Sequence, residues 1–238
     1  MLTPVLLLMR KMRPEKTIFG VISAMILASS IIIPVNLAAS DSIKVYTLQE
    51  IEQRGHLILI NQNNRLPTGY SPKDLETVNR VPTKLSNTLL QAETLSALEE
   101  MFEAAKNDSI DLLLYSGYRT EATQRTFYLR AGAGSKSVAP PRASEHETGY
   151  AADIVSINDK VLNTDFGKTP AGKWLAANCY KYGFILRYPN DKTRITRYMY
   201  EPWHYRYLGK AIAGKVHKSG LCYEEYIEEN GRLDASSN

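Results

Sequence analysis

Residues 144–153 read SEHETGYAAD and run into the apolar pair Ile154 and Val155. The stretch sets His146 and Asp153 seven residues apart around Gly149. A loop or tight turn at the glycine brings both side chains to one point, because glycine adopts backbone conformations that other residues avoid. A carboxylate that enters a β-branched apolar run is costly to bury unless a charged group pairs with it. The stretch therefore predicts a chemical site.

A second cluster, EPWH at residues 201–204, places a histidine three residues after a carboxylate. Two imidazoles and one carboxylate, with a fourth position left to water, match the ligand set of a catalytic zinc ion. The candidate metal ligands are therefore His146, Asp153 and His204. Glu201 is the candidate base for that water, because the neighbouring proline and tryptophan offer a partly apolar pocket that raises a carboxyl pKa. Taken singly, each histidine is more often a packed, hydrogen-bonded side chain.

Helices are predicted from apolar spacing and capping residues. Leu95, Leu98, Phe102 and Ala105 form one apolar stripe, which predicts an amphipathic helix over residues 86–107. Thr120 can cap a second helix that ends near residues 132–134. A third helix begins with Thr169 and Pro170 as N-cap and first residue and ends at Gly183, and two small helices follow up to residue 231.

Strands are predicted at four short apolar or aromatic runs, residues 57–61, 110–115, 184–188 and 204–207. Helices and strands alternate here without the regular period of βαβ units. The predicted fold class is therefore α+β, with a mainly antiparallel central sheet flanked by helices.

The first 39 residues differ in composition from the rest of the chain. Residues 1–16 carry four basic side chains against Glu15, and residues 18–37 carry no charge. About twenty apolar residues span a bilayer core, and basic residues before them place the N-terminus inside. We predict a basic cytoplasmic N-terminus (1–16), a transmembrane anchor (17–39), a stalk (40–53) and a working domain (54–238). A cleaved signal peptide is the alternative, although residues 36–40 lack a small residue at the −3 position.

The composition excludes several classes of protein. With 44% hydrophobic and 23% charged residues, the chain is neither disordered, collagen-like nor a coiled-coil array. Most of the net charge of +4 lies in the N-terminal part, so the working domain lacks the basic surface of a nucleic-acid-binding protein.

Only Cys179 and Cys222 are present. We predict that both are unpaired, since Cys179 falls on an apolar helix face, and a disulfide between them is the alternative.

Common hydrolase and redox signatures are missing from the sequence, which has no SxxK, GxSxG, HExxH, Walker loop or CxxC. The motifs that are present resemble the zinc D-alanyl-D-alanine carboxypeptidases of the VanY type and their relatives, the L,D-carboxypeptidases, the VanX dipeptidases and the hedgehog signalling domain. SEHETGYAAD fits the pattern SxHxxGxAxD, and EPWH fits ExxH. Further matches are SGYRT at residues 116–120 with Gln124 after it, YGFILRYP at 182–189 and YRY at 205–207. The likeness extends over about residues 57–226.

The resemblance implies a hedgehog/DD-peptidase-like zinc fold and a role for each matched residue. His146, Asp153 and His204 become the ligands of Zn²⁺, and Glu201 becomes the general base. Arg119 acts at the scissile carbonyl or at the substrate carboxylate, and the other substrate contacts are Ser116, Gln124 and Ser144. Arg187 and Arg206 are interpreted as residues of the sheet surface or of structural ion pairs. Relatives often have Pro-Gly-x-Ser where this chain has a bulkier Arg142, which affects the loop before the first ligand.

The function implied is a zinc-dependent D,D-carboxypeptidase that removes the C-terminal D-alanine from peptidoglycan stem peptides or their precursors. The alternatives are an L,D-carboxypeptidase, a cell-wall endopeptidase or a D-Ala-D-Ala dipeptidase on the same site, and, outside enzymes, a zinc-bearing binding module. Retention of Glu201 beside the three ligands argues against the binding module, which has no need of a base. We expect a monomer at the extracytoplasmic face of a bacterial plasma membrane, held there by its N-terminal segment and without a nucleic-acid partner.

Overall fold

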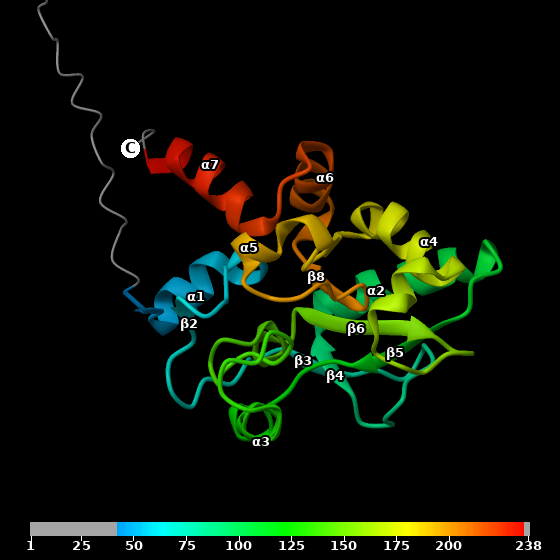
Figure 1. Cartoon of the computed structure of the whole chain (residues 1–238), viewed down its shortest axis with the longest axis horizontal. Coiled ribbons are helices and arrows are strands. Elements are labelled where there is room, and N and C mark those ends of the chain that lie inside the picture. The colour runs from blue at the N-terminus through cyan, green and yellow to red at the C-terminus, as the bar shows by residue number, and fades with distance from the viewer. Residues whose placement is uncertain (1–41, 236–238) are drawn as a thin grey trace, which may run out of the picture. The chain divides into compact units, whose positions relative to one another are not determined.

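The computed structural model describes residues 42–235 (Figure 1), so the predicted cytoplasmic segment 1–16 and the anchor 17–39 lie outside the described residues. The strands are β1 Lys44–Val45, β2 Asn64–Arg65, β3 Leu75–Thr77, β4 Leu89–Gln91, β5 Leu112–Ser116, β6 Ala151–Ser156, β7 Phe184–Leu186 and β8 His204–Tyr207. The α-helices are α1 Leu48–Arg54, α2 Ala92–Asn107, α3 Glu121–Ala131, α4 Pro170–Asn178, α5 Thr193–Thr196, α6 Gly209–Ser219 and α7 Tyr223–Ala235. Short 3₁₀ helices cover Gly55–Leu57, Glu145–Thr148, Thr164–Lys168, Cys179–Tyr182 and Asn190–Lys192. No helix within residues 42–235 is long and apolar enough to cross a membrane.

The central sheet has four strands in the order β5-β6-β8-β7, and every neighbouring pair is antiparallel. Two small two-stranded sheets accompany it, β3 with β4 antiparallel and β1 with β2 parallel. The prediction of an α+β fold with a mainly antiparallel central sheet is confirmed. Strands β6 and β8 are the centre of this sheet, and they carry the motifs singled out above.

The main core lies between the sheet and helices α2 and α4. The predicted stripe of α2 is buried through Leu95, Leu98, Phe102 and Ala105, and it packs with the buried residues of β5 and β6. The helix begins at Ala92 and not at residue 86, because residues 89–91 pair with β3 as strand β4. Burial of each large apolar side chain contributes about 1.5–3 kcal/mol to stability, so this stripe fixes the helix on the sheet.

The predicted caps are present. Thr120 accepts a hydrogen bond from the backbone of Thr123, and Thr169 accepts one from Gly172 with Pro170 as the first helical residue. Gly183 follows the 3₁₀ helix after α4 with a φ of 89°, which is left-handed and favours glycine.

Two predictions for the start of the domain are wrong. The stalk predicted at residues 40–53 is folded where the structure describes it, since α1 begins with a capping box and Tyr46 and Ile51 are buried with Ile58 and Ile60. Residues 57–61 are not a strand, although Ile58 and Ile60 are buried. Their carbonyls bind side chains in place of a neighbouring strand: the Tyr223 hydroxyl donates to Leu57 at 2.6 Å and the Arg206 guanidinium donates to Ile58 at 2.8 Å.

Both cysteines are free and buried in the structure, which agrees with the prediction that they are unpaired. Burial also raises the pKa of the Cys179 thiol to about 12, so this thiol stays protonated at neutral pH.

We expect a thiol reagent to leave the native protein unmodified. After unfolding without reductant, it should label both of the chain's cysteines. An unfolded, unreduced chain with no reactive thiol would instead mean a disulfide.

Candidate active site

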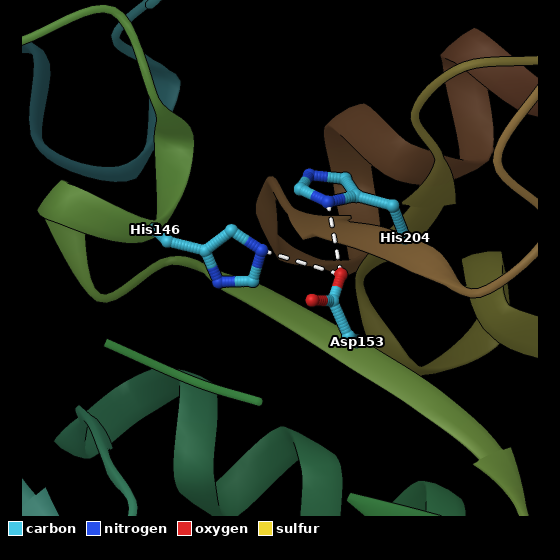
Figure 2. A group of neighbouring side chains, drawn as sticks. All are labelled: His146, Asp153 and His204. Atoms are coloured by element: carbon cyan, nitrogen blue, oxygen red, sulfur yellow. Dashed lines mark hydrogen bonds and ion pairs between the residues drawn. The ribbon is translucent and has the colours of Figure 1, made fainter. Parts of the chain in front are cut away.

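Three side chains from separate elements converge at one end of the central sheet (Figure 2). His146 lies in the 3₁₀ helix Glu145–Thr148, Asp153 on β6, and His204 at the start of β8 directly opposite Asp153. The Oδ1 atom of Asp153 is 3.2 Å from Nε2 of His146 and 3.1 Å from Nδ1 of His204. All three residues are buried, and their ligand atoms lie within 4.8 Å of one another. The structure thus brings together the three residues predicted as metal ligands.

Gly149 makes this convergence possible. It ends the 3₁₀ helix with a φ of 77°, a left-handed conformation that turns the chain into β6. A Cβ atom at this position would lie 2.9 Å from Cδ2 of Leu75 and 3.1 Å from Cγ of Gln91. The prediction of a tight turn at this glycine is confirmed.

The outward ring nitrogen of each histidine has its own partner. Nδ1 of His146 lies 2.7 Å from the carbonyl oxygen of Gly117, to which it can only donate. Nε2 of His204 lies 3.4 Å from Oε2 of Glu145. When both outward nitrogens donate, both inward nitrogens keep a lone pair for a metal, as is usual for metal-binding histidines. The donor set therefore fits a zinc ion.

The electrostatics of the site favour a cation. Burial lowers the pKa of His146 to about 4 and keeps its ring neutral. Burial also opposes the charged form of His204, but hydrogen bonds to Asp153 and Glu145 outweigh it and raise the pKa of His204 to about 9. Burial would raise the pKa of Asp153, yet the two imidazoles hold it well below its usual range. The His204 ring thus keeps a proton between the buried carboxylates of Asp153 and Glu145. A metal ion bound at this place can replace that proton.

Arg119 occupies the other side of Asp153. Its guanidinium donates to Oδ2 of Asp153 at 3.0 Å, to Oγ of Ser116 at 3.3 Å and to Oε1 of Gln124 at 3.2 Å. The two oxygens of Asp153 are thereby divided between the imidazoles and the arginine. The Gln124 amide is buried and also donates to the carbonyl of Ala139 at 2.8 Å, so its polar groups already have partners within the chain. Gln124 therefore orients Arg119 in this structure.

Glu201 lies beside the cluster and is buried. Its Oε2 is 3.9 Å from Nδ1 of His204, and its Oε1 is a buried atom without a hydrogen-bond partner. Burial raises the pKa of Glu201 to about 8. A buried carboxylate oxygen without a partner is costly unless a water or substrate group completes it. Both features suit a proton acceptor that faces a reacting water.

A cavity of about 750 Å³ opens onto these residues. Arg119, Ser144, Glu201 and the three converging residues contribute to its polar wall, and Leu85, Phe127 and Met199 to its apolar wall. This size suits a small ligand or the end of a peptide. Ser116, Gln124 and Ser144, predicted to lie near the substrate, all line it.

The loop before His146 takes an unusual backbone conformation at Arg142. Arg142 has a φ of 67°, a left-handed conformation that is unusual for a residue with a side chain. Its backbone N–H donates to Oε1 of Glu147 at 2.7 Å, and its guanidinium donates to Thr68 at 3.1 Å. The side chain points away to Thr68, and the described wall of the cavity contains Ser144 but not Arg142.

One residue of the site was not predicted from the sequence. Glu145 is fully buried, and its Oε1 accepts from Nε of Arg187 at 2.7 Å and from Nη1 of Arg206 at 2.9 Å. Both arginines are also fully buried, which confirms structural ion pairs and excludes the sheet surface. The sequence held one signal for this residue, because Arg187 and Arg206 lie on predicted strands. An arginine that faces the core requires a buried anion as its partner.

Comparison with known proteins assigns the chain to a family. The model of the VanY family, described as D-alanyl-D-alanine carboxypeptidase, matches residues 87–210. The chain belongs to the VanY family. Within it, the D-alanyl-D-alanine carboxypeptidase of Enterococcus faecalis is 36% identical over 193 residues, covering 74% of this chain and 67% of that protein.

Solved structures of VanY-type peptidases share the fold. The LdcB LD-carboxypeptidase superposes with a TM-score of 0.72 at 37% identity, covering 78% of this chain and 90% of that chain. The VanY D,D-pentapeptidase from a VanB-type resistance cassette, a mutant in complex with Zn(II), gives a TM-score of 0.61 at 34% identity over 72% of this chain and 98% of that one. The predicted zinc-peptidase fold is therefore confirmed.

Proposed function

We propose that this chain is a zinc-dependent D,D-carboxypeptidase that removes the C-terminal D-alanine from peptidoglycan stem peptides. The observation that carries the proposal is the convergence of His146, Asp153 and His204 beside the unpartnered Oε1 of Glu201. Family membership supports the substrate class. The structure of VanYB in complex with D-alanine-D-alanine, 34% identical to this chain, supports recognition of that dipeptide end.

The reaction is a hydrolysis in which a water adds to the scissile carbonyl and the C–N bond breaks. Zinc held by His146, Asp153 and His204 would polarise that carbonyl and lower the pKa of a water toward ~7. Glu201 takes a proton from the attacking water and returns it to the nitrogen of the leaving D-alanine. Its burial keeps bulk water from competing for that proton.

Arg119 supplies the positive charge that the substrate requires. It is held by three neighbours on the cavity wall, and its side chain is 17% exposed. A guanidinium in this place can bind the terminal carboxylate of the substrate or the oxyanion formed at the carbonyl. Its planar fork suits either role better than the point charge of a lysine would.

Product analysis tests the proposed specificity. The purified full-length chain, loaded with zinc, is incubated with pentapeptide and tetrapeptide stems, and the products are identified by mass spectrometry. We expect the pentapeptide to lose one alanine residue and the tetrapeptide to persist. Loss of the terminal D-alanine from the tetrapeptide would instead indicate an L,D-carboxypeptidase, the candidate favoured by the likeness to LdcB. Release of the intact dipeptide would indicate a dipeptidase, and no change would indicate a binding module.

We further propose that the chain works as a monomer at the outer face of the plasma membrane, anchored by residues 17–39. The uncharged run at residues 18–37 supports an anchor, since about twenty apolar residues hold a protein in a bilayer far more firmly than a basic patch does. We expect the protein to stay with membranes in carbonate and in high salt, and the detergent-solubilised chain to have the mass of one copy. Recovery of a soluble form that starts near Ser40 would instead indicate a cleaved signal peptide.

A further inference from the structure

A chain of buried ion pairs runs from His204 to the C-terminal helix α7. Glu145 accepts from His204 through Oε2 and from Arg187 through Oε1. Arg187 in turn donates two hydrogen bonds to Glu224 of α7, at 2.6 Å to Oε1 and at 2.8 Å to Oε2. The side chains of Arg187 and Glu145 are fully buried, and that of Glu224 is 14% exposed. One continuous set of contacts therefore joins α7 to a candidate metal ligand.

The charges of the arginines and glutamates in this set balance only when Glu224 is included. Arg206 also donates to Glu145, at 2.9 Å, so two buried guanidinium groups face a single carboxylate there. Arg206 has further acceptors in the carbonyls of His56 and Ile58. Both terminal nitrogens of Arg187 donate to Glu224. Without Glu224, Arg187 would keep its positive charge close to the metal-binding cluster. It would lose the carboxylate that accepts from both of its terminal nitrogens.

The first and last parts of the described chain meet at this point. Asn61 donates to Oε1 of Glu224 at 3.2 Å, and Tyr223 donates to the carbonyl of Leu57. These segments fall outside residues 87–210, which the family model matches. Arg187 itself lies inside that range, so Glu224 and Asn61 reach it or its partner from outside the part that the family model matches.

We infer that Glu224 is a positioning residue for the metal site: by holding Arg187, it keeps Glu145 in place to accept from Nε2 of His204, so that Nδ1 faces the metal. This inference rests on the assignment of His204 to the metal in the proposed function. Partners behind a metal ligand fix its ring orientation, and their loss typically costs 10–100-fold in metal affinity or activity. In Glu224→Gln, Arg187 loses a charged acceptor, and the excess positive charge repels a bound cation.

The test compares Glu224→Gln with Glu225→Gln in the full-length chain. Glu225 is the matched control, because it is the next residue of α7 and also forms an ion pair, with Lys192 at 2.9 Å, but has no described contact with Arg187. Zinc affinity is measured by competition with a chelating dye, and the N–H protons of the histidine rings are followed by NMR in the zinc-free protein. We expect the zinc Kd of Glu224→Gln to rise ~10–100-fold and its His204 Nε2–H signal to broaden or vanish. Glu225→Gln should match the wild type in both measurements.

Each outcome bears on a different claim. Equal zinc affinity and an unchanged ring signal in the two variants would overturn the inference. If Glu224→Gln does not fold, Glu224→Asp is compared with Glu225→Asp in the same way, and equal affinities there would overturn it as well. His204→Ala is measured alongside: if it binds zinc like the wild type, then the metal assignment of the proposed function fails, independently of Glu224.

Discussion

Glu201→Gln is expected to bind about one zinc per chain while its turnover falls by ~10²–10⁴ or more. Glutamine is nearly equal to glutamate in shape, but it cannot accept a proton from the attacking water. Glu201 also stands apart from the three side chains whose ligand atoms converge within 4.8 Å. Metal content and turnover of a stem peptide, measured on the same preparation, check both parts. Full activity would exclude Glu201 as the base, and loss of zinc would make it a ligand.

The pH dependence gives a second measure of the same role. A base works only when deprotonated, so kcat/KM should rise with pH through the apparent pKa of the coupled pair formed by Glu201 and the attacking water. Burial raises the pKa of Glu201 to about 8 in the zinc-free site, and a nearby cation moves it down from there. We expect the rising limb to flatten in Glu201→Gln.

Arg119→Ala is expected to lose turnover by roughly 10²–10³, the loss seen when one donor to a developing oxyanion is removed. It should keep its fold and bind zinc when zinc is in excess, because the three converging ligands remain. Some loss of zinc affinity is expected, since Oδ2 of Asp153 loses the partner that orients it. Arg119→Lys should recover little, because one ammonium cannot reproduce the fork that reaches Asp153, Ser116 and Gln124.

Arg125→Ala is the matched control for this experiment. Arg125 lies on the neighbouring helix α3, where it is 58% exposed and pairs with Glu121 at 2.7 Å. An exposed ion pair of this kind contributes little, so the control should keep its activity. If Arg119→Ala also keeps near wild-type turnover, then Arg119 has only a structural role, in its ion pair with Asp153.

The sequence predicted the features that depend on local spacing. Thr120 and Thr169 were identified as caps because N-capping is a contact within one turn, and the stripe of α2 because its period is helical. Convergence of His146 and Asp153 followed from the glycine between them. His204 was added to them because two imidazoles and one carboxylate match a zinc ligand set, and the resemblance to a known family implied the same three ligands. The pairing of β6 with β8, which places His204 opposite Asp153, was not predicted.

The features that were missed depend on partners far away in the sequence. Residues 57–61 have the composition of a strand, but their carbonyls bind Arg206 and Tyr223, more than 140 residues away. The segment 40–53 looks like a stalk until its Tyr46 and Ile51 are seen to pack with Ile58 and Ile60. Glu145 was missed for the same reason, since its role is visible only when two distant arginines are found in the core.

The pairing of β6 with β8 also decides when the metal site can form. Asp153 and His204 are 51 residues apart in the chain and stand opposite each other only in the correct register. A slip of one residue would turn one of the two side chains to the opposite face of the sheet. A long loop must close before a cation can meet all three ligands, so zinc held by the three stabilises only the sheet aligned in this register.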